Sequence, residues 1–176
     1  ALGGMLRLDA VGKVALLTAA LLFLGLAAYA QAYLRRRADV DNRLLVAGML
    51  AALSFMTVVG LAQHFGLLWV AVELTTLSTA PLVYFNRSAR SLEATWKYLL
   101  LSSLGVALAL LGTFFLAYAG AFRGGPRTLL ADELVRRAHE LPLPWVRAAF
   151  VFLLVGYGTK AGLAPLHTWK PDAYGD

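Results

Sequence analysis

Two ionisable side chains lie within long apolar segments, where charged residues are rare. Glu73 lies in the apolar segment 65–85, eight residues after Phe65. At ~1.5 Å rise per residue, this places it about 12 Å along a helix. Lys160 follows the apolar run 148–155. An acid and an amine that share a water-poor interior change each other's affinity for a proton. The two residues together therefore predict a switchable proton site.

Each of these residues also has a purely structural interpretation. A protonated Glu73 would hydrogen-bond a neighbouring helix. Lys160 lies about 24 Å along a helix from Pro144, so its side chain could instead extend to the membrane interface. However, residues 156–165 contain three glycines and one proline, and a helix interrupted at a charge is typical of transport sites. This spacing favours a functional role for Lys160.

His167 and Lys97 are the next candidates, as groups that relay protons. Histidine side chains exchange protons near neutral pH, so His167 could serve as a relay or could hydrogen-bond the interrupted backbone. Lys97 follows a predicted loop beside Trp96 and is interpreted either as an interfacial anchor or as a buried relay group. No metal or cofactor site is expected, because the chain has no cysteine and its three histidines are scattered.

The composition predicts that membrane-spanning helices position these residues. Of the 176 residues, 60% are hydrophobic and 15% are charged, and the mean hydropathy is +0.68, whereas soluble domains have ~45–50% apolar and ~25% charged residues. A compact soluble domain of this size could not bury so many apolar side chains. Apolar runs near the ~20 residues needed to cross a bilayer occur at 11–34, 44–62, 65–85, 95–122 and 145–164. The sequence therefore predicts an all-α, polytopic transmembrane helical bundle of about five spans, with the last span broken.

The basic residues predict the orientation of these spans. The net charge is +6, and clustered arginines mark the cytoplasmic side of a membrane protein. Arg35, Arg36 and Arg37 therefore place loop 35–43 in the cytoplasm, together with loop 86–93, and they are not interpreted as a nucleic-acid site. The link 123–144 is expected on the outer side.

A short amphipathic helix is predicted within this outer link. Thr128 is expected to cap it, and apolar residues recur at helical spacing at Leu130, Leu134, Ala138 and Leu141. Pro142 is expected to end it. Such a helix either lies in the membrane interface or packs on neighbouring helices.

The segment after the fifth span carries a long motif. Residues 158–174 read GTKAGLAPLHTWKPDAY, which closely resembles the antiporter-like, proton-translocating membrane subunits shared by respiratory complex I, Mrp-type antiporters and group 4 hydrogenases. Residues 69–74 (WVAVEL) and 92–100 (LEATWKYLL) are similar to the hydrogenase 4/formate hydrogenlyase branch, which includes membrane component F.

The resemblance implies roles for particular residues. Glu73 matches the family's glutamate of the fifth helix, Lys160 the lysine of the broken seventh helix and His167 the histidine of the following loop. The chain 1–176 then resembles helices three to seven of a roughly fourteen-helix subunit, as a single membrane domain whose amino and carboxyl parts are expected to be missing.

The resemblance also implies a function and a setting. The expected function is a Glu–Lys proton half-channel in a redox-driven ion pump of a bacterial or archaeal inner membrane. Other integral membrane subunits and a peripheral redox arm would be the partners, and iron–sulfur, nickel–iron or quinone centres would belong to them. Two alternatives stay open: a subunit of a Mrp-type cation/proton antiporter or ion-uptake complex, or a structural or assembly component in which Glu73 and Lys160 form a static salt bridge. The pumped ion, proton or sodium, is not fixed by the sequence.

Overall fold

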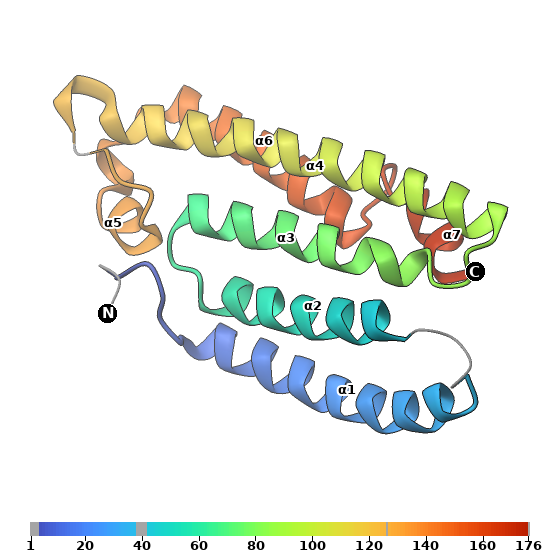
Figure 1. Ribbon diagram of the computed structural model, residues 1–176. Coiled ribbons are helices and arrows are strands. Elements are labelled where there is room, and N and C mark those ends of the chain that lie inside the picture. The colour runs from blue at the N-terminus through green and yellow to red at the C-terminus, as the bar shows by residue number, and fades with distance from the viewer. Residues whose placement is uncertain (1–3, 38–41, 126, 176) are drawn as a thin grey trace.

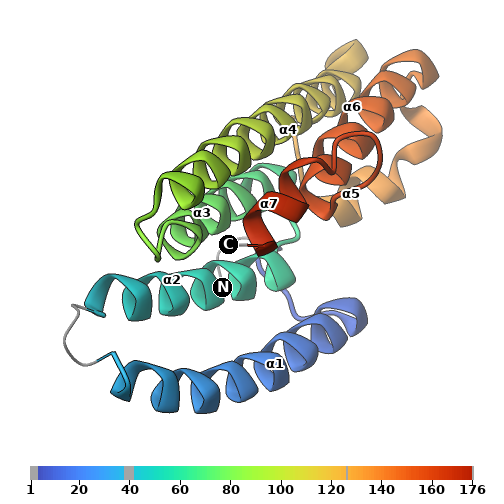
Figure 2. The ribbon, with the colours of Figure 1, turned by 90° about the vertical axis from the view of Figure 1, so that its right-hand side faces the viewer.

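The protein is a bundle of long helices that run back and forth, as predicted (Figure 1). The computed structural model describes residues 4–37, 42–125 and 127–175. Its long helices are α1 (Ala10–Arg35), α2 (Arg43–Leu61), α3 (Phe65–Val83), α4 (Ala89–Ala121) and α6 (Leu143–Ala161). Between α4 and α6 lie η2 (Phe122–Gly124), α5 (Ala131–Arg136) and η3 (Ala138–Glu140), and α7 (Trp169–Gly175) follows α6. Consecutive helices α1 to α4 lie side by side, and α6 returns along α4 (Figure 2).

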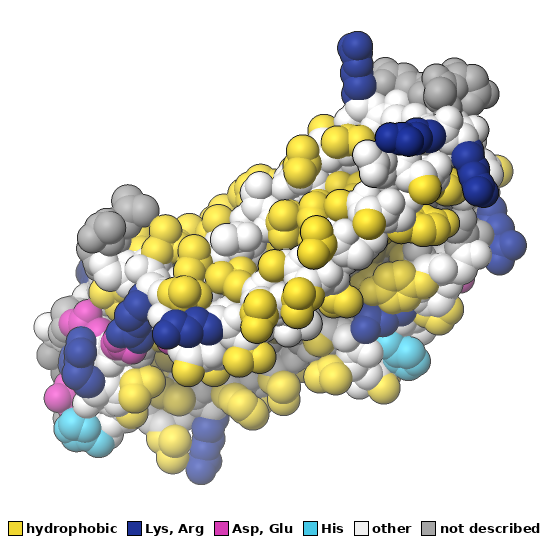
Figure 3. Space-filling view, turned by 90° about the horizontal axis from the view of Figure 1, so that it is seen from below, with side chains coloured by type: hydrophobic (Ala, Val, Ile, Leu, Met, Phe, Trp, Pro, Cys, Tyr) yellow, Lys and Arg dark blue, Asp and Glu magenta, His cyan; other side chains and the backbone are white. Residues whose placement is uncertain are grey.

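Four of these helices, α1 to α4, are long and apolar enough to cross a membrane. The fifth predicted span corresponds to α6, which has 19 residues. It is not among the helices that satisfy both criteria, and Arg147 and Lys160 lie within it. A broad apolar belt covers the surface between two charged ends in Figure 3. The prediction of a polytopic helical bundle is therefore confirmed, with four spans that satisfy length and composition and a fifth long helix that carries two charged residues.

The two ends of the bundle are built differently. At the α5 end, residues 4–7, 62–64 and 127–132 meet, since Leu6 pairs with Ala62 and His64 pairs with Leu130 in isolated bridges. At the α7 end, α7 packs against the beginning of α4, where Lys97 contacts Asp172. The predicted outer links thus meet at the α5 end. The 84–88 connection lies at the α7 end, as does the described part of loop 35–43, whose residues 38–41 lie outside the described residues.

Small residues allow α4 and α6 to touch backbone to backbone. A Cβ atom added to Gly156 would lie 2.5 Å from the backbone nitrogen of Ala109, and one added to Gly105 would lie 2.7 Å from Cβ of Thr159. In a membrane, where lipid is as apolar as leucine, such close packing of small residues drives helix association. It also fixes the last turn of α6 against α4, which is where Lys160 lies.

Two helices begin at residues other than those predicted from the sequence. Helix α4 begins at Ala89 rather than near residue 95, because Ser88 and Ser91 form a reciprocal capping box. The amphipathic helix begins at Ala131, and Thr128 does not cap it: its hydroxyl accepts from the backbone of Leu130 before the helix starts. This helix packs on its neighbours, since Leu134 is buried against Leu116 and Ala149 of α4 and α6.

Candidate functional site

Lys160 lies in the last turn of α6 and points towards α3 and α4. Its Nζ atom donates a hydrogen bond to Oγ1 of Thr76 at 2.9 Å and to the hydroxyl of Tyr98 at 2.7 Å. It also lies 4.7 Å from the centroid of the Tyr98 ring, within the range of a cation–π contact. Two hydroxyl groups and one aromatic face therefore hold the ammonium group.

Glu73 lies in the middle of α3, three residues before Thr76. Its Oε1 atom accepts a hydrogen bond from Ser103 of α4 at 3.1 Å, whereas its Oε2 atom is buried and has no hydrogen-bond partner in the described part of the chain. Among the described residues no ion pair joins Glu73 to Lys160. Glu73 nonetheless lies about one helical turn before Thr76, the residue of α3 that Lys160 binds. The predicted pair is brought together as neighbours that are each bound to other groups.

Tyr98 links α4 to both α3 and α6 through one hydroxyl group. It is 5% exposed, and its hydroxyl lies 2.6 Å from Oγ1 of Thr79 as well as 2.7 Å from Lys160. Its ring packs against Trp169 of α7, with a centroid distance of 5.2 Å. A cavity of about 330 Å³ adjoins these groups and is lined by Met56, Thr75, Thr79, Val83, Tyr98, Lys160, Trp169, Ala173 and Tyr174.

The helix break predicted after Lys160 is present. Helix α6 ends at Ala161, and Gly162 adopts the left-handed conformation with φ 77° and ψ 39°, which glycine adopts at no steric cost. The carbonyl of Thr159 accepts from Nε1 of Trp169 at 3.1 Å, and that of Ala161 accepts from Nζ of Lys170 at 2.7 Å. The side chain of Lys170 thus satisfies a carbonyl group at the break, and Trp169 adds a second bond to the carbonyl of Thr159, which also accepts from the backbone of Gly162.

His167 and Lys97 lie apart from this cluster. The side chain of His167 is exposed and makes no hydrogen bond within the described residues, so the backbone at the break is bonded by Trp169 and Lys170 instead. Lys97 is bound by two carboxylates, Glu93 at 2.8 Å and Asp172 at 2.9 Å. It lies in the third turn of α4 and ties α7 to that helix.

The hydroxyl groups around Lys160 were not singled out by the sequence analysis. Glu73, Thr76 and Thr79 follow one another at three-residue spacing and share one face of α3. This polar stripe on an apolar helix could have identified Thr76 and Thr79 as site residues from the sequence. Tyr98 has no such signal, because only the packing of α4 against α6 turns it towards Lys160.

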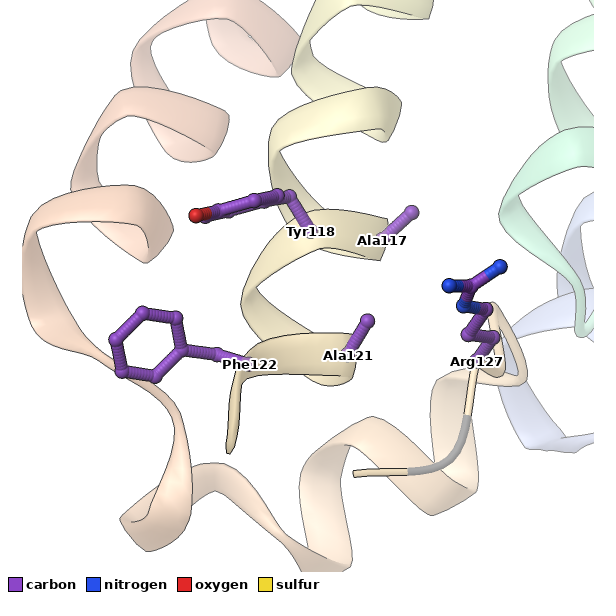
Figure 4. A pocket seen from close by; sticks show the side chains of 5 residues that line it. All are labelled: Ala117, Tyr118, Ala121, Phe122 and Arg127. Atoms are coloured by element: carbon purple, nitrogen blue, oxygen red, sulfur yellow. The ribbon is translucent and has the colours of Figure 1, made fainter. Parts of the chain in front are cut away.

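A second cavity is lined by fewer polar groups. It has a volume of about 470 Å³ and lies at the α5 end, where Ala117, Tyr118, Ala121, Phe122 and Arg127 line it (Figure 4). Arg127 is the one ionisable cation among these, and the lining is otherwise alanine and aromatic. No group of three or more histidine, aspartate or glutamate residues suited to a metal ion occurs among the described residues.

Known proteins share both the sequence and the fold. A 117-residue stretch is 42% identical to the hydrogenase-4 component F homolog of Methylacidiphilum infernorum, covering 65% of this chain and 25% of that protein. The NADH-quinone oxidoreductase subunit N of Thioalkalivibrio sulfidiphilus is 33% identical over 147 residues, covering 83% of this chain and 30% of the relative. The chain thus spans about a quarter to a third of the length of these curated relatives.

Solved structures point to the same group of proteins as the sequence relatives. Respiratory complex I from Thermus thermophilus with bound aureothin contains a chain that superposes with a TM-score of 0.73 and 29% identity, covering 99% of this chain and 36% of the other. The membrane-bound sulfane sulfur reductase, an archaeal respiratory membrane complex, gives a TM-score of 0.66 and 27% identity over 72% of this chain and 25% of its own. Residues 62–176 match the family described as NADH:quinone oxidoreductase/Mrp antiporter, TM. The predicted resemblance is confirmed, and the chain belongs to this family of multi-pass membrane subunits.

Proposed function

We propose that this chain supplies a proton-binding half-channel to a redox-driven ion pump. Lys160 carries the proton, and Glu73 controls how firmly Lys160 holds it by moving closer or further away. His167 and Lys97 exchange protons between this site and the α7 end, which faces the cytoplasm of a bacterial or archaeal cell. Iron–sulfur, nickel–iron or quinone centres belong to a peripheral arm and to other membrane subunits.

One observation carries this proposal: a lysine at a helix break lies next to a cavity and is held by neutral hydroxyls, near an acid that has one unbonded carboxylate oxygen. A cation inside an apolar bundle is costly and persists where it serves transport. The hydroxyls of Thr76 and Tyr98 stabilise the charged form without fixing it as an ion pair would. The free Oε2 atom of Glu73 is an alternative acceptor for the same ammonium. A site with two such positions can bind and release a proton.

The structure bears differently on the two alternatives, the static salt bridge and the cation/proton antiporter. A static Glu73–Lys160 salt bridge is disfavoured, because the two side chains bond to other partners in the described structure. A cation/proton antiporter remains the second candidate, since the matching family includes Mrp antiporters. Copurification of the full-length subunit with iron–sulfur proteins would favour the redox pump, and its absence would favour the antiporter.

The test uses the full-length subunit in its assembled complex, reconstituted in liposomes. Lys160→Met and Glu73→Gln are compared with Lys13→Met, a matched change at an exposed lysine of α1. Fluxes of protons and of sodium ions are recorded separately with a pH-sensitive dye and radioactive sodium. We expect at least a tenfold loss of proton flux for Lys160→Met, a smaller loss for Glu73→Gln and none for Lys13→Met. Unchanged coupling in the first two variants would refute the mechanism.

A further inference from the structure

Tyr98 holds the proton site together through one hydroxyl group. This hydroxyl accepts from Lys160 at 2.7 Å and lies 2.6 Å from Oγ1 of Thr79. Because an ammonium group can only donate, the Tyr98 proton is free to point at Thr79. Thr79 in turn is within bonding distance of the backbone oxygens of Thr75 and Thr76, at 2.9 and 3.1 Å. A continuous hydrogen-bond chain therefore runs from Lys160 into the backbone of α3.

The position of Tyr98 is linked to the helix break. Its ring packs 5.2 Å from that of Trp169, and Trp169 donates to the carbonyl of Thr159, the residue before Lys160. Trp169 is 4% exposed, so the stack is enclosed. A displacement of α7 would therefore move the hydroxyl that holds the ammonium group.

A second acceptor for Lys160 lies on the neighbouring turn of α3. The four-carbon stem of Lys160 is flexible. Glu73 lies about one helical turn before Thr76, the residue of α3 that Lys160 binds, and the Oε2 atom of Glu73 is buried with no partner in the described residues. A carboxylate binds an ammonium group more strongly than a neutral hydroxyl does. The observed position, on Thr76 and Tyr98, therefore depends on the acceptors that these two residues supply together.

We infer that Tyr98 is a further positioning residue of the proton site, which competes with Glu73 for the ammonium group of Lys160. The inference rests on the proposed function. With the hydroxyl present, Lys160 is held away from the acid and can release its proton. Without it, Lys160 moves to Glu73 and stays there as an ion pair. Tyr98 thus governs how Lys160 is divided between the two positions.

The test is Tyr98→Phe in the assembled complex, which removes the hydroxyl and keeps the ring on Trp169. A hydrogen bond to a charged group is worth enough to shift a two-position equilibrium about tenfold. We expect proton flux to fall about tenfold, and electron cryomicroscopy of the variant to show Nζ of Lys160 bonded to Glu73. Tyr157→Phe is the matched control, because the hydroxyl of Tyr157 on α6 is buried and bonds to none of the described residues; it should pump at the wild-type rate.

A second comparison separates positioning from a general structural role. Glu73→Asp shortens the competing side chain by one methylene group, so in that background Tyr98→Phe should reduce flux less than threefold. An equal fold-loss in both backgrounds would overturn the inference, as would flux within twofold of wild type with Lys160 still bonded to Thr76. If Tyr98→Phe does not assemble, Thr76→Val removes the other acceptor with little change of shape and must give the same displacement of Lys160. Normal flux in Lys160→Met would instead overturn the proposed function itself.

Discussion

Gly156 is the point at which the packing of α6 sets the position of Lys160. In Gly156→Ala, the added methyl group would lie 2.5 Å from the nitrogen of Ala109 and 2.6 Å from the oxygen of Gly105. Both are backbone atoms, so no side-chain rotation can relieve the contact. Ordinary van der Waals contact begins at 3.4 Å, and α4 and α6 must therefore separate locally by about 0.9 Å.

Lys160 lies one helical turn after Gly156, and a separation of this size exceeds the lengthening that its hydrogen bond to Tyr98 can tolerate. The hydrogen bond of 2.7 Å to Tyr98, which lies on α4, would lengthen to about 3.6 Å, which is too long for a hydrogen bond. Thr76 lies on α3, so its bond to Lys160 is not stretched directly. Overpacking costs about 1–3 kcal/mol, and alanine recovers about 1 kcal/mol over glycine in a helix. We therefore expect a net destabilisation of only about 0–2 kcal/mol but at least a tenfold loss of proton flux.

The assay compares Gly156→Ala with Gly25→Ala in the reconstituted complex. Gly25 lies in α1, and a Cβ atom there meets nothing within 4 Å, so this variant should pump normally and melt at the same temperature or slightly higher. Proton flux and thermal unfolding are measured on the same preparations. Wild-type flux in Gly156→Ala would show that the distance between α4 and α6 does not set the geometry of Lys160.

Two further predictions concern the ends of the bundle. The hydrogen-bonded guanidinium of Arg7 lowers the pKa of Asp132 from its ordinary 3.8, so the pair stabilises the fold above pH 3.8 and stops doing so as the pH falls through the lower pKa of the folded state. Asp132→Asn should then lower the melting temperature slightly at pH 7, less in high salt because both side chains are half exposed, and not at strongly acid pH; a difference that persists in acid would contradict this. Lys97→Gln removes the ion pair with Asp172 and should increase protease cleavage at α7, measured by mass spectrometry, whereas unchanged cleavage would show that ring packing alone holds α7.

The sequence was sufficient to predict the architecture because each membrane span is a long apolar run that can be recognised without knowledge of its neighbours. Long apolar runs bounded by charge predicted α1 to α3 closely, and the glycines and proline near Lys160 predicted the break that Gly162 makes. The limits of α4 and α5 were less accurate. They depend on caps made by short polar side chains, and the same residue types also occur in turns.

The sequence by itself determined that Glu73 and Lys160 are the unusual charges, since an ionisable residue within an apolar run stands out without any knowledge of its neighbours. Only the tertiary structure decided what these charges contact. The close approach of α4 and α6 at Gly156 turns Tyr98 towards Lys160, and the polar face of α3 supplies Thr76. Such contacts join residues 62 and 84 positions apart, and nothing in local spacing encodes them, because they arise from the way in which three helices pack.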